Sequence, residues 1–86
     1  MRTPTTLTKE ELSPIKHTLF GMLQSADKWD DPDYESLCDS LKDLSFKRYS
    51  LDSYAVQLGD IVEEMIDLDD IGFDMGQLYH FKGKLK

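Results

Sequence analysis

Hydrophobic residues recur along the chain at the three- and four-residue spacing of helices that bury one face. The first such segment begins at a capping box, Thr8-Lys-Glu-Glu11, or at Ser13-Pro14, where proline would occupy the first helical position. The pattern predicts a helix from about Glu10 or Pro14 to Gln24. Its apolar face consists of Leu12, Ile15, Leu19, Met22 and Leu23, with Phe20 beside them.

A second amphipathic segment follows Asp31-Pro32, a pair that places an N-cap residue before a first-turn proline. The spacing of its apolar residues predicts a helix from about Pro32 to Leu44. The apolar face holds Tyr34, Leu37, Cys38, Leu41 and Leu44. We therefore expect the thiol of Cys38 to be buried and chemically inert.

The third segment, Phe46 to Leu68, begins in a connector from Ser45 to Leu51 and then predicts a helix with one apolar and one acidic face. Asp52 is a favourable N-cap residue for it. The apolar side holds Tyr54, Leu58, Ile61, Val62, Met65 and Leu68; the acidic side holds Asp60, Glu63 and Asp67, with Glu64 at its margin. Val56 is an apolar residue within the acidic side, and Gly59 costs the helix about 1 kcal/mol relative to alanine.

A short last helix is expected from Met75 to about Lys82, capped by Asp74, with Met75, Leu78, Tyr79 and Phe81 facing inward. No alternating pattern indicates a strand. The sequence thus predicts an all-α fold, a small bundle of four helices. It forms one domain over residues 1–86, with a flexible lead at 1–8 and a flexible basic tail at 83–86.

The charge is unevenly distributed, with a net charge of −7 and no Lys or Arg from Tyr49 to Phe81. Contacts with phosphates need clustered cations, so direct nucleic-acid binding is disfavoured and a basic protein partner is favoured. The alternative is that the acidic surface only keeps the domain soluble. The absence of an apolar run of about 20 residues and of a signal-peptide core indicates a cytoplasmic protein that does not span membranes.

No residue pattern indicates an active site or a metal centre, so we expect neither enzymatic activity nor a bound metal. The Asp52-Ser53 pair is different. A serine at the start of a helix is exposed, and the helix N-terminus favours an attached anion such as a phosphodiester. This arrangement suits a serine that other proteins modify.

Three stretches of the chain resemble the acyl and peptidyl carrier protein family. Phe46-Lys-Arg-Tyr-Ser-Leu-Asp-Ser-Tyr54 is similar to the family signature Phe-x-Asp-Leu-Gly-x-Asp-Ser-Leu. Val56-Gln-Leu-Gly-Asp-Ile-Val-Glu-Glu-Met-Ile66 resembles its acidic second helix, and Met75-Gly-Gln-Leu-Tyr-His-Phe81 resembles its last helix. The resemblance covers residues 10–82. It implies that Ser53 carries covalent 4′-phosphopantetheine.

The chain departs from the family signature in four places. Ser50 stands where the family has glycine, and Tyr54 replaces the usual aliphatic residue after the serine. One residue is missing between Tyr54 and Val56. The segment for a short third helix is too short, whereas the loop before the serine is longer and holds the extra helix that begins at Pro32.

Several alternatives stay open on the residues alone. Another register makes Ser50 the attachment point. A third possibility is that this stretch only caps the helix, with Asp52 or Ser50 accepting hydrogen bonds from backbone N–H groups. If the resemblance holds, Asp52, Val56, Asp60, Glu63, Glu64 and Asp67 would dock a phosphopantetheinyl transferase and basic acyl- or aminoacyl-handling enzymes. The competing function is a small acidic inhibitor or nucleic-acid mimic, such as a phage anti-defence or immunity-type protein, that blocks a basic site on its target.

Overall fold

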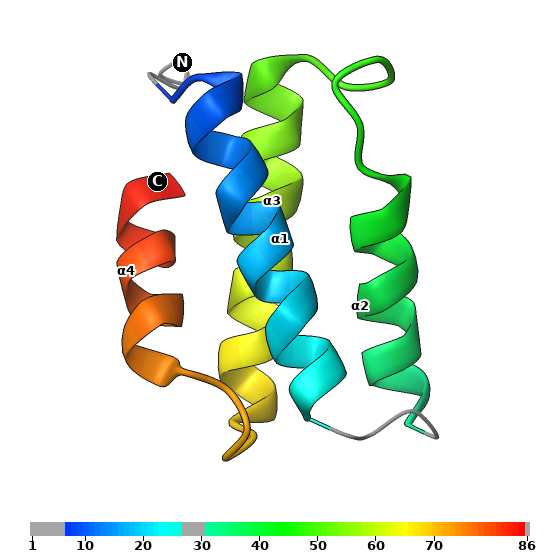
Figure 1. The fold of residues 1–86 in the computed structure, drawn as a ribbon, viewed down its shortest axis with the longest axis vertical. Coiled ribbons are helices and arrows are strands. Elements are labelled where there is room, and N and C mark those ends of the chain that lie inside the picture. Colours follow the sequence, from blue (N-terminus) through cyan, green and yellow to red (C-terminus); the bar gives the residue numbers. More distant parts are fainter. Residues whose placement is uncertain (1–6, 27–30, 86) are drawn as a thin grey trace.

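The computed structural model describes residues 7–26 and 31–85, and all the regular secondary structure within them is helical (Figure 1). The elements are α1 (Lys9–Ser25), α2 (Pro32–Asp43), α3 (Leu51–Leu68) and α4 (Met75–Leu85). The predicted all-α fold with four helices is confirmed over these residues. None of the described helices combines the length and apolar character needed to cross a membrane.

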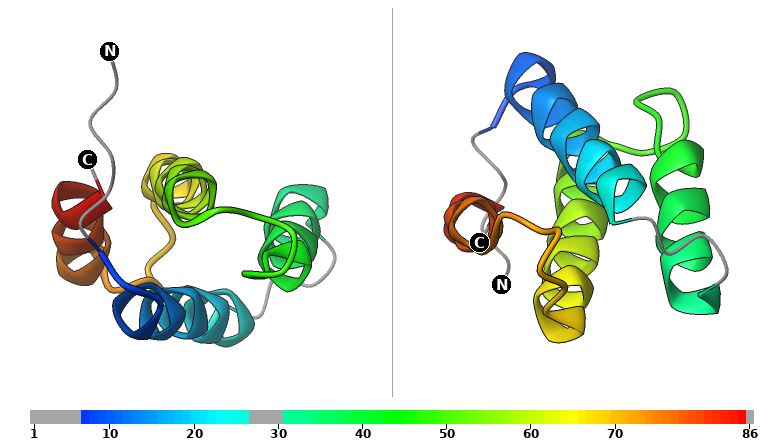
Figure 2. Two further views of the ribbon diagram at one scale, coloured as in Figure 1. Left: turned by 90° about the horizontal axis from the view of Figure 1, so that it is seen from above. Right: turned by 60° about the horizontal axis from the view of Figure 1, so that its bottom comes forward.

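Helices α1 and α3 lie on opposite sides of the core. Seen from above, α4 stands at one end of this pair and α2 at the other (Figure 2). Helix α3 packs against α1 and α4, and α2 packs against α1. Helices α1 and α3 therefore each contact two other helices, and the apolar face of α3 is buried between α1 and α4.

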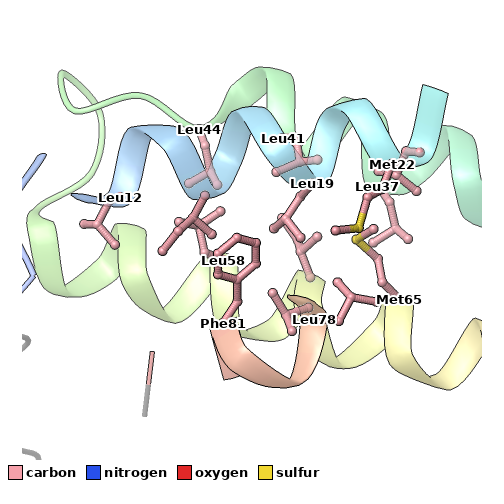
Figure 3. Close-up of a cluster of buried hydrophobic side chains, with 14 of the residues drawn as sticks. Leu12, Leu19, Met22, Leu37, Leu41, Leu44, Leu58, Met65, Leu78 and Phe81 are labelled. Carbon is pink, nitrogen blue, oxygen red and sulfur yellow. The ribbon is translucent and has the colours of Figure 1, made fainter. Parts of the chain in front are cut away.

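The core is built from the apolar faces that the sequence pattern predicts. Figure 3 shows side chains from all four helices meeting in it. Leu12 and Leu19 of α1, Leu41 of α2, Leu58 and Met65 of α3 and Leu78 of α4 are fully buried. Cys38 is buried as expected, and burial raises the pKa of its thiol. At about 25 cal/mol per Å² of buried apolar surface, this shared core is the main source of stability.

Helix α1 begins at Lys9, and the predicted capping box is confirmed, with Thr8 as the N-cap. The carboxylate of Glu11 accepts a hydrogen bond from the backbone N–H of Thr8 at 3.4 Å. This cap starts the helix upstream of Pro14, which lies inside it and removes one N–H from the early helical ladder. The prediction that proline occupies the first helical position is therefore wrong.

Regular structure includes part of each segment that was expected to be flexible. Helix α4 continues to Leu85, whose side chain packs against the core, so residues 83–85 are helical. At the other end, Leu7 is buried and Thr8 is the N-cap of α1. The rest of the expected lead and Lys86 lie outside the described residues.

The prediction that Tyr79 faces inward is also wrong. Helix α4 buries Leu78 and Phe81, which lie three residues apart on one side of the helix. Each residue advances the helix by about 100°, so Tyr79 points away from this pair. Its side chain is 56% exposed, whereas Met75 is partly buried against the core.

Gly59 lies in the middle of α3 without a packing reason for lacking a side chain. A Cβ atom at this position would lie 3.9 Å from the Cβ of Leu85, an ordinary van der Waals contact. We expect Gly59→Ala to raise the free energy of unfolding by about 0.5–1 kcal/mol, because alanine has the higher helix propensity. Urea denaturation would measure this gain, and a loss of stability would show that α4 packs too closely for the methyl group.

Helix α2 is tied to the turn after α3 by the side chain of Asp70. The hydroxyl of Tyr34 donates a hydrogen bond to Oδ2 of Asp70 at 2.7 Å, and the N–H of Gly72 donates to Oδ1 at 2.7 Å. Asp69 ends α3 in the left-handed conformation, with φ of 48°, which turns the chain toward α4. One carboxylate thus joins two segments that are distant in sequence.

Candidate functional site

The N-terminus of α3 is capped by Ser50, and the prediction that Asp52 is the N-cap is wrong. The backbone of Ser50 is extended, and its Oγ accepts a hydrogen bond from the N–H of Ser53 at 3.2 Å. Helix α3 therefore begins at Leu51, and Asp52 lies in its first turn. There the carboxylate of Asp52 interacts favourably with the helix dipole without serving as the cap.

Ser53 lies inside the first turn of α3, with its side chain exposed. The hydroxyl of Ser50 donates to the Oγ of Ser53 at 3.2 Å, so the two candidate serines are direct neighbours. The roles of the two hydroxyls differ, because that of Ser50 also caps the helix. Ser53 is thus the serine that can be modified without removing the cap.

The connector before α3, residues 45–50, is held in place by a pair of stacked aromatic rings. The rings of Phe46 and Tyr54 lie 4.2 Å apart between centroids, with planes inclined by 11°. Tyr54 is 1% exposed, and burial raises its pKa. The residue that departs from the family signature after Ser53 therefore belongs to the core. This stacking positions the connector, and with it Ser50, against the start of α3.

An acidic stripe runs along the exposed side of α3 and consists of Asp60, Glu63, Glu64 and Asp67, all of them exposed. Within the described residues, none of these four carboxylates forms an ion pair. Their three- and four-residue spacing brings like charges together, at a cost of about 0.2–0.5 kcal/mol per pair. Docked cations would relieve this repulsion.

The other predicted docking residues lie toward the start of the same helix. Asp52 is exposed, and Val56 is half-buried. At successive angles of about 100°, Ser53 projects from the same broad side of α3 as the acidic stripe. Ser53, the half-buried Val56 and the carboxylates of the acidic stripe therefore lie on one side of α3.

The far side of the domain carries a surface that the sequence did not reveal. Two adjoining hollows lie between α1, the end of α2 and the connector, and we call them the basic groove. Its lining includes Lys9, Lys16, Lys42, Phe20 and Phe46, with Ser13 and His17 shared by both hollows. Only α1 and α2 packed together bring these separate lysines into one groove.

Three lysines are held in place in this groove. The Nζ of Lys16 donates a hydrogen bond to the carbonyl of Leu44 at 2.7 Å. The Nζ of Lys9 lies 5.6 Å from the ring centroid of Phe46, and that of Lys42 lies 5.9 Å from the ring centroid of Phe20. Both distances fall within the range of cation–π attraction. The positive charges are therefore positioned before any ligand arrives.

Within residues 7–26 and 31–85, no cluster of His, Cys, Asp or Glu side chains is suited to hold a metal ion. The site thus offers hydroxyl groups and charged surfaces. Comparison with protein-family models, with curated proteins and with solved structures finds no match.

Proposed function

We propose that this protein is a carrier protein that holds acyl or aminoacyl groups as thioesters on a 4′-phosphopantetheine arm attached to Ser53. The observation that carries the proposal is the exposed hydroxyl of Ser53 in the first turn of α3, beside the acidic stripe. The positive end of a helix dipole favours the phosphodiester that would link such an arm to the chain. In this role the protein itself performs no catalysis.

The docking surface in this proposal consists of Asp52, Val56 and the acidic stripe. The carboxylates of the acidic stripe, which form no ion pair within the described residues, would attract a transferase and basic acyl- or aminoacyl-handling enzymes over several ångströms and raise their association rates. The half-buried Val56 would supply an apolar contact between them. Basic partners in the cytoplasm, and no direct contact with nucleic acid or membrane, follow from the same proposal.

Modification of the purified protein tests the attachment site. We expect incubation with coenzyme A and a broad-specificity phosphopantetheinyl transferase to add one phosphopantetheine group, detected by intact-protein mass spectrometry. Ser53→Ala should abolish the mass gain. Ser50→Asp should retain it, because aspartate keeps the N-cap while removing the hydroxyl.

Further variants separate attachment from docking. Asp60→Asn combined with Glu63→Gln should slow modification on the order of tenfold at low salt, since part of the steering charge is lost. If Ser50→Asp abolished the mass gain and Ser53→Ala did not, the attachment site would be Ser50 and not Ser53. A properly folded wild-type protein that gains no mass with any such transferase would overturn the carrier proposal.

A second candidate is a small acidic inhibitor or nucleic-acid mimic, favoured by four exposed carboxylates without ion-pair partners on one helix. Carboxylates spaced along α3 would occupy a basic site in place of phosphates. This function requires no attached arm. Unmodified wild-type protein should then block a nucleic-acid-binding enzyme in a salt-sensitive manner, and the variant with Asp60→Asn and Glu63→Gln should not.

A further inference from the structure

Two oppositely charged surfaces face away from the common core on opposite sides of the bundle. The acidic stripe lies on the exposed side of α3, and the basic groove lies between α1, the end of α2 and the connector. Helices α1 and α3 themselves lie on opposite sides of the bundle (Figure 2). One domain cannot bring these two surfaces together. We propose that copies of this protein associate head to tail, with the acidic stripe of one copy docked in the basic groove of the next.

The two surfaces match in length. The stretch from Val56 to Asp67 on α3 and the stretch from Lys9 to Phe20 on α1 each span about 17 Å at a rise of 1.5 Å per residue. The stretch on α3 presents the four carboxylates of the acidic stripe, whereas the groove presents three lysines. The carboxylates lie between Asp60 and Asp67, a span of about 10 Å along α3, so opposite charges can face each other over that part of the contact.

Both surfaces also carry apolar groups. Val56 is half-buried at the start of the stretch on α3, and the rings of Phe20 and Phe46 contribute apolar lining to the groove. The positions of Lys9 and Lys42 above these rings reduce the side-chain entropy that docking would cost. Glu10 opposes docking, because it adds one negative charge to the lining of the groove.

The net charge of −7 determines how this association responds to salt. Repulsion between whole domains acts over longer distances than attraction between docked side chains. At about 0.1 M salt the Debye length is about 10 Å, which screens the long-range repulsion more than the contact pairs. At about 1 M salt it falls to about 3 Å, and the attraction is screened as well.

Such association would cover the same carboxylates that a basic partner needs. Free copies would protect each other's acidic stripes, and a partner with higher affinity would separate them. This association does not require a modified serine. It is therefore independent of the proposed carrier function.

Sedimentation equilibrium of the unmodified full chain tests the association. We expect the average mass to rise above 9.9 kDa with concentration at about 0.1 M salt and to return to the monomer at about 1 M. A groove variant with Lys9→Gln and Lys42→Gln, and a stripe variant with Asp60→Asn and Glu63→Gln, should each remain monomeric. Circular dichroism would confirm that both are folded.

Mixing the two variants gives the decisive result. The groove variant retains an intact stripe and the stripe variant retains an intact groove, so the mixture should form a one-to-one complex that grows no further. Its mass should be about twice 9.9 kDa. A wild-type protein that stays monomeric at every concentration, or a mixture that forms no complex, would overturn the proposal.

Discussion

Tyr54→Ala should lower the free energy of unfolding by about 3–5 kcal/mol, the usual cost of deleting a buried aromatic ring. Tyr54 is 1% exposed, and its ring is stacked on Phe46 at 4.2 Å. The substitution leaves a cavity beneath α3 and removes the partner that holds the connector. In a domain of 86 residues this loss is a large part of the total stability. Chemical denaturation monitored by circular dichroism would measure it.

Tyr54→Phe is the matched control, because it keeps the ring and removes only the hydroxyl. It should change the free energy of unfolding by less than about 1.5 kcal/mol, as expected for a substitution that conserves volume. Phe46→Ala should reproduce part of the loss, since this ring is only partly buried. Equal stability of Tyr54→Ala and Tyr54→Phe would show that the stacked pair does not anchor the connector.

Raising the pH from 10 toward 12 should destabilise the protein through Tyr34. Burial, together with the hydrogen bond to Asp70 and the negative charge of Asp70, raises the pKa of Tyr34 from 10 to about 12. Below pH 10 the native and unfolded states are both protonated at Tyr34, and its contribution to stability is constant. Between pH 10 and 12 the unfolded state loses the proton first, so stability falls as the pH rises.

Two variants isolate this effect. Tyr34→Phe should reduce stability by about 1–2 kcal/mol at neutral pH, because a hydrogen bond to a charged carboxylate is lost. It should also show a shallower decline above pH 10, measured by urea denaturation at several pH values. Asp70→Asn should remove the repulsion that opposes ionisation of Tyr34, so absorbance of the tyrosinate should appear at lower pH. An unchanged decline in Tyr34→Phe would assign the alkaline sensitivity to another group.

The positions of the helices along the chain were predictable, because the spacing of apolar residues is a local signal. The stripe of Tyr34, Leu37, Leu41 and Leu44 defines one buried face regardless of what covers it, and all four are buried. Helix ends were harder to predict, because several adjacent residues can cap. At the start of α3, Ser50, Asp52 and Ser53 are all suitable by type, and only the backbone conformation decides for Ser50.

The candidate site was predictable where it lies on one helix. The outer side of α3 follows from its own periodicity, so Ser53 and the acidic stripe could be identified together. The basic groove and the bond between Tyr34 and Asp70 join residues from separate elements, for which spacing along the chain carries no signal. The stacking of Phe46 on Tyr54 likewise joins the connector to α3, and spacing along the chain does not predict it.

Because α2 lies at one end of the bundle, the thiol of Cys38 on this helix can report local opening of the domain. Helix α2 packs against α1 (Figure 1). The hydroxyl of Tyr34 connects α2 to the turn after α3 by its hydrogen bond to Asp70. A segment with few attachments opens at a lower free energy than the whole domain unfolds. Such opening would expose the thiol of Cys38 to solvent. The rate at which an alkylating reagent labels Cys38 would therefore read the free energy of local opening without any introduced probe.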